Sequence, residues 1–183
     1  MEKVFVNTEN ALNPKGVYSI KLNQLGVPKT ITIDDKLPLR NGSTIFSEPG
    51  TDNSLWMAVL EKAFAKYHGN YAHIEAGDPS VAITTMTGAP YIQYAHNANT
   101  DVNELWGKLV AHDQAKDIMT CGSSSGSDKN TSSTGIVLGH AYTLLSTVVT
   151  SGGVKLVKVR NPHGNEKYTG PYSDGSTQMT EAL

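Results

Sequence analysis

The sequence of 183 residues predicts a protein of the α+β class. Two segments, at 16–34 and 137–160, have the apolar and β-branched patterns of β-hairpins. Two others repeat apolar residues at the three- and four-residue spacing of amphipathic helices, one ending near Tyr67 and one ending near His112. Hairpins and helices that occupy separate stretches of one chain favour the α+β class.

The first hairpin is expected at 16–34. Residues 16–22 alternate loosely and carry β-branched and aromatic side chains, whereas 29–34 alternate strictly between polar and apolar side chains. The residues between them, 23–28, include the asparagine, glycine and proline that are typical of turns. This pattern predicts two strands joined by a short turn.

The first helix has the most regular pattern of the sequence. Its apolar residues recur at helical spacing up to Tyr67: Trp56, Val59, Leu60, Ala63, Phe64 and Tyr67. The N-cap could come from any of the three polar residues that precede the helix: Asp52, Asn53 or Ser54. Gly69, just after the last apolar residue, is placed for a C-cap.

The second helix is expected to begin after Asn99 or Thr100 and to reach about His112. Asp101 and Glu104 then lie in its first turn, where negative charge interacts favourably with the helix dipole. The segment between the helices, 72–99, is rich in glycine, proline and threonine, and we expect two lobes to meet there, as domains 1–76 and 77–183.

The last part of the chain is predicted to be a loop followed by a hairpin. Residues 122–135 are nearly all serine, threonine and glycine, which is typical of a flexible loop. Two apolar, β-branched runs follow, 137–149 and 154–160, about a turn at 151–153.

Composition excludes several classes of function. Lys and Arg total 15 against 17 Asp and Glu, for a net charge of −2, so the chain lacks the basic surplus of a nucleic-acid-binding protein. Its apolar runs are too short to cross a membrane, and residues 1–20 show no signal-peptide pattern. We therefore expect a soluble cytoplasmic protein. Cys121, the single cysteine, excludes an internal disulfide framework.

The second hairpin carries a candidate catalytic pair, His140 and Asn161. A turn centred on Gly152 would place His140 opposite Gly164 and Asn161 opposite Thr143, so a small register shift or bulge would bring the pair into contact. A cysteine protease needs a histidine that is oriented by an amide oxygen. The alternative is a structural histidine whose two ring nitrogens are both satisfied by neighbours.

Five blocks of the sequence, in order, resemble motifs of the calpain family of cysteine proteases. They are GVY at 16–18 with IDDKLP at 33–38, LEKAFAK at 60–66, GHAY at 139–142, LVKVRNPHG at 156–164 and YTGPYSD at 168–174. Each block is weak alone, but their order and spacing together are specific. The resemblance implies a papain-like cysteine proteinase fold, that of the calpain protease core. Residues 1–76 would be the C-terminal part of the Cys-bearing lobe, and 77–183 a β-rich lobe bearing the His and Asn.

The resemblance also implies a function: a calcium-dependent cysteine endopeptidase that performs limited intracellular proteolysis, with extended peptides of other proteins as substrates. His140 would be the base and Asn161 its orienter. The catalytic cysteine is expected in a missing N-terminal segment of the Cys lobe, so this chain alone should be inactive. Cys121 precedes no amphipathic helix and is expected to be a buried strand thiol.

Several departures from the family pattern concern calcium. An expected glutamate is replaced by Ala72, and an expected acidic position is occupied by Lys167, with Glu166 one residue out of place. Only Asp174 matches a calcium-ligand position, so calcium binding by this chain is expected to be weak or absent.

A further departure is His163, which stands where the family has tryptophan. It would remove an aromatic wall beside the catalytic pair, and its protonated form could repel an imidazolium at His140. Three functions stay open: part of an active endopeptidase, a catalytically degenerate calpain-like domain that acts as a binding or regulatory module, and an unrelated β-rich binding domain.

Overall fold

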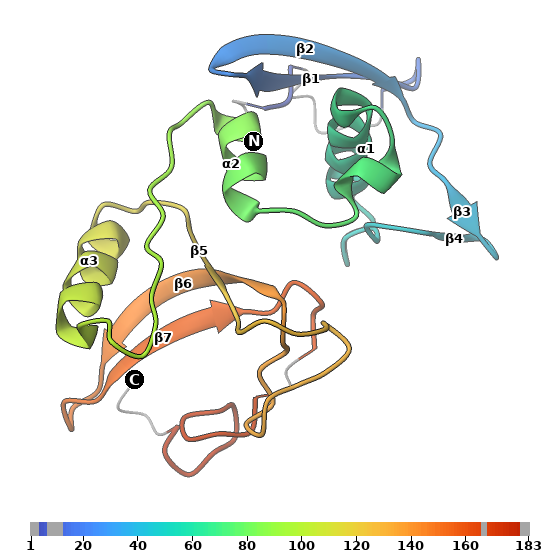
Figure 1. Ribbon diagram of the computed structural model, residues 1–183. Coiled ribbons are helices and arrows are strands. Elements are labelled where there is room, and N and C mark those ends of the chain that lie inside the picture. Colours follow the sequence, from blue (N-terminus) through green and yellow to red (C-terminus); the bar gives the residue numbers. More distant parts are fainter. Residues whose placement is uncertain (1–3, 7–12, 166–167, 180–183) are drawn as a thin grey trace. The chain divides into compact units, whose positions relative to one another are not determined.

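The computed structural model describes residues 4–6, 13–165 and 168–179, and it shows a mixture of helices and β-sheets (Figure 1). The chain divides into two compact units, Met1–Gln93 and Tyr94–Leu183. The sequence placed a domain boundary after Ala76. The division lies after Gln93 because helix α2, Pro79–Thr87, packs against a strand of the first unit.

The first unit is built on an antiparallel hairpin of β1, Val17–Gln24, and β2, Val27–Asp34, which confirms the predicted hairpin. Its two turn residues, Leu25 and Gly26, have φ values of 50° and 81°. Two successive positive φ values match the right-handed twist of the flanking strands, so the turn is compact. The buried face of the hairpin carries Ile20, Leu22, Ile31 and Ile33.

Helix α1, Trp56–His68, covers this face and confirms the predicted helix. Figure 1 shows α1 and α2 on the same side of the hairpin. The predicted N-cap is wrong, because Leu55 occupies the cap without a side-chain bond and Asp52 instead accepts a hydrogen bond from the Ser54 N–H at 3.0 Å. The C-cap at Gly69 is confirmed, with φ at 107° and its N–H donating to the Lys66 carbonyl.

Helix α2 was not predicted, since the segment 72–99 has no clear apolar periodicity. Its ends nevertheless carry standard signals. The Asp78 carboxylate accepts a hydrogen bond from the Ser80 N–H at 2.8 Å, Pro79 is the first helical residue, and Gly88 ends the helix at a φ of 75°. Three further short elements were also missed: β3 at Leu39–Arg40, β4 at Ser43–Thr44 and the 3-10 helix η1 at Tyr71–Ile74.

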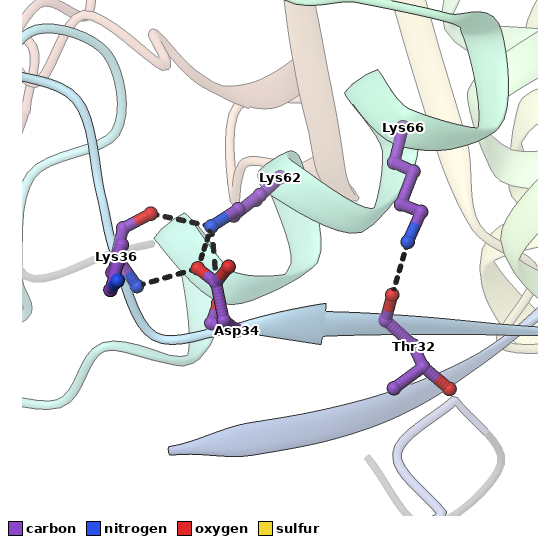
Figure 2. A network of polar contacts seen from close by, with 5 residues as sticks. All are labelled: Thr32, Asp34, Lys36, Lys62 and Lys66. Atoms are coloured by element: carbon purple, nitrogen blue, oxygen red, sulfur yellow. Dashed lines mark hydrogen bonds and ion pairs between the residues drawn. The ribbon is translucent and has the colours of Figure 1, made fainter.

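Two lysines of α1 bind β2 and the residues just after it (Figure 2). Lys62 Nζ donates to the carboxylate and carbonyl of Asp34 and to the Lys36 carbonyl, and Lys66 Nζ donates to the Thr32 carbonyl at 2.7 Å. The Lys62 hydrogen bond, followed by the Lys36 N–H, lowers the pKa of Asp34. Because the folded-state pKa is the lower one, this contribution to stability is present above about pH 4 and is lost as the pH falls through the lowered pKa.

The second unit is a three-stranded antiparallel sheet in the order β5-β6-β7, covered by helix α3. The strands are β5, Met119–Gly122, β6, Ala141–Val149, and β7, Lys155–Arg160. The predicted hairpin of β6 and β7 is confirmed, although its first strand begins at Ala141 and not at Val137, and β5 adds a third strand. Helix α3, Val102–Gln114, confirms the second predicted helix. Asp101 is its N-cap, with its carboxylate accepting hydrogen bonds from the N–H groups of Asn103 and Glu104.

Asp113 near the end of α3 fixes this helix to the central strand. Its Oδ2 atom accepts hydrogen bonds from the Thr147 N–H at 2.7 Å and the Thr147 hydroxyl at 2.9 Å. These two bonds lower the pKa of Asp113. At the other end of the helix, Lys155 of β7 donates to Asn103 Oδ1 at 2.8 Å. The sheet that carries the candidate pair is thus anchored at both ends of one helix.

Across the part of the chain that the structure describes, no helix combines the length and the apolar character that a membrane span requires.

Candidate active site

His140 and Asn161 are in direct contact at the open end of the β6–β7 hairpin. His140 immediately precedes β6, Asn161 immediately follows β7, and the distance from His140 Nε2 to Asn161 Oδ1 is 2.9 Å. The Asn161 amide nitrogen donates to the Asn165 carbonyl at 3.1 Å, which turns the amide oxygen toward the ring. The predicted contact is confirmed. The contact by itself does not assign a catalytic role to either residue.

A bulge in β6 makes this contact possible. Near the turn, Ser146 pairs with Lys158, as a turn centred on Gly152 requires, but beyond Leu145 the register shifts and Thr143 pairs with Arg160. Asn161 therefore does not lie opposite Thr143. One extra residue in a strand reverses which face the following side chains point to, so the bulge decides whether His140 and Asn161 meet.

The backbone of His140 is held by the loop before the hairpin. The Ser123 hydroxyl oxygen accepts a hydrogen bond from the His140 N–H at 2.9 Å, and the Ser123 N–H donates to the His140 carbonyl at 2.9 Å. The preceding residue, Gly139, has a φ of 54°, and a Cβ there would overlap the Gly126 carbonyl oxygen. A side chain at position 139 would therefore displace His140.

Ser123 was not recognised from the sequence. It lies in a run of serine, threonine and glycine, 122–135, in which nothing marks one serine as different from the others. Gly139 carried a weak signal, because a glycine directly before a candidate catalytic residue suggests a close approach of two backbone segments.

Within the described part of the chain, one of the two His140 ring nitrogens has a hydrogen-bond partner. Nε2 is bonded to Asn161, and Nδ1 has no hydrogen-bond partner among the residues that the structure describes. The edge of Tyr142 lies against the ring, with centroids 4.9 Å apart and planes at 87°. Tyr142 is itself buried, and its hydroxyl accepts a hydrogen bond from the Val137 N–H at 2.9 Å.

This geometry differs from that of a structural histidine, whose two nitrogens would both be satisfied. A neutral imidazole with its proton on Nε2 has a lone pair on Nδ1. Asn161 holds the ring in that tautomer, so His140 can accept a proton through Nδ1. The arrangement is suited to general-base chemistry.

His163 also packs against His140. The ring centroids are 4.4 Å apart with planes tilted by 47°, and the His163 N–H donates to Asn161 Oδ1 at 3.0 Å. The expected loss of an aromatic wall therefore needs correction, because an imidazole ring stands beside the pair. Unlike tryptophan, this ring can carry a positive charge.

Cys121 lies in strand β5 opposite Tyr142. Its side chain is half-buried, and burial raises the pKa of its thiol. A reactive cysteine normally has a lowered pKa at a helix N-terminus or beside a cation. The expectation of a strand thiol is confirmed, and the raised pKa leaves little thiolate near neutral pH.

Residues that could hold calcium are sparse. Asp174 is exposed in a turn, Ala72 is exposed in η1, and Glu166 and Lys167 lie outside the described residues. Within residues 4–6, 13–165 and 168–179, no three His, Cys, Asp or Glu side chains gather closely enough to hold a metal ion. Calcium takes six to eight oxygen ligands, which include backbone carbonyls as well as carboxylates.

Comparison with known proteins gives a consistent match. A family model described as "Calpain family cysteine protease" matches residues 1–182. The calpain-type cysteine protease ADL1 of Oryza sativa subsp. japonica is 37% identical over 178 residues, and DEK1 of Zea mays is 36% identical over 178 residues, each match covering 93% of this chain. Calpain-A of Drosophila melanogaster is 32% identical over 180 residues, covering 91% of this chain.

These relatives are much longer proteins. The chain spans 8% of the length of the two plant proteins and 21% of the length of the Drosophila protein. The similarity therefore concerns one part of each relative.

Proposed function

Because this chain belongs to the calpain family of cysteine proteases, we propose that it forms part of a calcium-dependent endopeptidase that performs limited intracellular proteolysis. His140 is the general base and Asn161 its orienting residue. Substrates are extended peptide segments of other proteins. The observation that carries the proposal is the 2.9 Å hydrogen bond from His140 Nε2 to Asn161 Oδ1, together with an Nδ1 atom that has no hydrogen-bond partner among the described residues.

The proposed mechanism assigns one task to each group. His140 Nδ1 takes the proton of a thiol, and the resulting thiolate attacks the carbonyl carbon of the scissile peptide bond. Asn161 keeps the imidazolium oriented through Nε2. The same imidazolium then returns the proton to the leaving amine.

In this proposal the thiolate comes from outside these 183 residues, since Cys121 lies in a strand and burial raises the pKa of its thiol. The proposed architecture is the papain-like one, with a Cys-bearing lobe and a β-rich lobe. In support, the first unit carries the hairpin and helix that resemble the Cys lobe, and the second carries the His140–Asn161 pair on a sheet.

Replacement of Asn161 tests the proposal. In the full-length protein, Asn161→Ala is expected to lower kcat/KM for a fluorogenic peptide at least about tenfold, because a base that is not held in position transfers its proton less efficiently. The matched control is Asn165→Ala. This variant keeps the backbone carbonyl of residue 165, which accepts a hydrogen bond from the Asn161 amide nitrogen. Equal activity of the two variants would rule out an orienting role for Asn161.

A second candidate is a catalytically degenerate calpain-like domain that acts as a binding or regulatory module. One observation favours it: Cys121, the one cysteine of this chain, lies in a strand, and burial raises the pKa of its thiol. A thiol-directed epoxide probe distinguishes the two functions. Covalent labelling of the full-length protein, lost in His140→Ala, supports the endopeptidase, whereas no labelling supports the module.

Calcium binding by this chain is expected to be weak, with one site at best. Asp174 alone supplies a carboxylate at a position that resembles a family ligand, and a hard cation needs several oxygen ligands at once. Titration calorimetry with calcium chloride should therefore show little heat, and Asp174→Asn should remove what there is. Two tight sites on the 183-residue chain would contradict this expectation.

A further inference from the structure

We propose that Ser123 is a positioning residue for the proposed base, because its hydroxyl fixes the backbone from which the His140 side chain projects. The inference deepens the proposed function and rests on it for the catalytic consequence. The placement of the ring by Ser123 is a property of this chain alone, and it can be measured separately from activity.

Ser123 and His140 face each other just beyond the end of the β5–β6 ladder. Gly122 pairs with Ala141 at the end of that ladder, so Ser123 and His140 are the next two residues in register. The Ser123 N–H continues the ladder and donates to the His140 carbonyl at 2.9 Å. The His140 N–H donates at 2.9 Å to the Ser123 hydroxyl oxygen, which takes the place of a strand carbonyl.

The hydroxyl of Ser123 serves both backbone groups of His140 at once. It accepts the His140 N–H and donates its own proton to the His140 carbonyl, with the two oxygen atoms 3.2 Å apart. The N–H and the carbonyl lie on either side of the His140 Cα atom. Because the backbone N, Cα and C atoms of a residue determine the direction of its Cβ atom, holding both groups fixes the point from which the ring projects.

The residue before His140 is held by the same loop. The Gly139 N–H donates to the Ser124 carbonyl at 2.7 Å, and a Cβ atom at position 139 would overlap the Gly126 carbonyl oxygen. These contacts involve backbone atoms, whereas Ser123 contributes through its side chain. A substitution can therefore remove the hydroxyl of Ser123 while the rest of the loop keeps its contacts.

The ring of His140 depends on the position of this backbone. Its Nε2 atom lies 2.9 Å from Asn161 Oδ1, and its centroid lies 4.9 Å from that of the Tyr142 ring. An N–H···O hydrogen bond keeps its strength over only a few tenths of an ångström. A shift of the His140 backbone would therefore weaken the bond to Asn161, and a misplacement of about 1 Å at an active site can lower a rate about 100-fold.

The position of the ring is measured by NMR in the 183-residue chain at one fixed pH. Ser123→Ala keeps the backbone N–H of residue 123, and it is expected to weaken the nuclear Overhauser effects between the rings of His140 and Tyr142. Ser123→Thr keeps a hydroxyl and is expected to retain them. The matched control is Ser124→Ala, because Ser124 is exposed and contacts Gly139 through its backbone carbonyl.

The catalytic consequence is measured in the full-length protein with a fluorogenic peptide. Ser123→Ala is expected to lower kcat about tenfold with KM unchanged, because the substitution displaces the base and leaves substrate binding intact. Ser123→Thr and Ser124→Ala are expected to keep the kcat of the wild-type protein.

Ring contacts and kcat that fall in Ser123→Ala and return in Ser123→Thr support the proposal. It would be overturned by unchanged ring contacts or an unchanged kcat in Ser123→Ala, by a threonine variant no better than alanine, or by an equal loss in Ser124→Ala. Absence of hydrolysis by the wild-type full-length protein would contradict the proposed function instead. The NMR result would then still decide whether Ser123 places the ring.

Discussion

The 183-residue chain by itself is expected to hydrolyse no peptide bond faster than buffer does. It carries the proposed base and orienting residue, His140 and Asn161, but its one thiol has a raised pKa and lies in strand β5. Loss of one member of a catalytic triad typically costs about 10⁴-fold or more in rate. A fluorogenic peptide assay at high protein concentration measures this, with calcium present and absent.

Cys121→Ser is the decisive control for that result. If Cys121 has no catalytic part, the variant and the wild-type chain should show the same background rate. Turnover by the wild-type chain that disappears in Cys121→Ser would contradict the expectation and make Cys121 the nucleophile.

Replacement of Leu144 by alanine is expected to cost about 2–5 kcal/mol of the free energy of unfolding, as for other buried leucines. Leu144 is 6% exposed in the central strand, between Met119 of β5 and Val159 of β7. Alanine at this position leaves a cavity, and the two flanking strands prevent the surrounding side chains from filling it. Urea unfolding followed through the NMR amide signals of β6 reports on this unit directly.

The neighbouring residue provides a matched control. Leu145 undergoes the same chemical change in Leu145→Ala, but it is 47% exposed and lies at the bulge, outside the ladder of pairs. Its replacement is expected to cost less than about 1 kcal/mol. Equal losses for the two variants would mean that burial at position 144 does not control the stability of this sheet.

Regular elements with a strong apolar pattern could be predicted from the sequence. Helices α1 and α3 and both long hairpins follow from side-chain spacing, because burial of one face requires a fixed period. Helix α2 could not be predicted in this way. Its small and β-branched residues give little periodicity, and contact with β1 stabilises it instead.

The helix caps also differ in how well the sequence predicts them. Asp101 caps α3 within two residues of the expected start, because a carboxylate before a periodic segment is a local signal. At α1, three candidate caps precede the helix, and the structure uses none of them. The Asp52 carboxylate bonds to Ser54 in a turn, which is a competing local interaction that sequence cannot rank.

The identity of the candidate catalytic pair was determined by the sequence, through the motifs around His140 and Asn161 and their place on one hairpin. Their contact was decided by the tertiary structure. The side chains meet because of the bulge at Leu145, and two adjacent leucines give no sign of which one faces the core. The choice of Ser123 to hold His140, and of His163 to lie against it, depends on loops folded back onto the hairpin end. Such contacts join residues far apart in the chain, whereas sequence patterns report on neighbours a few positions away.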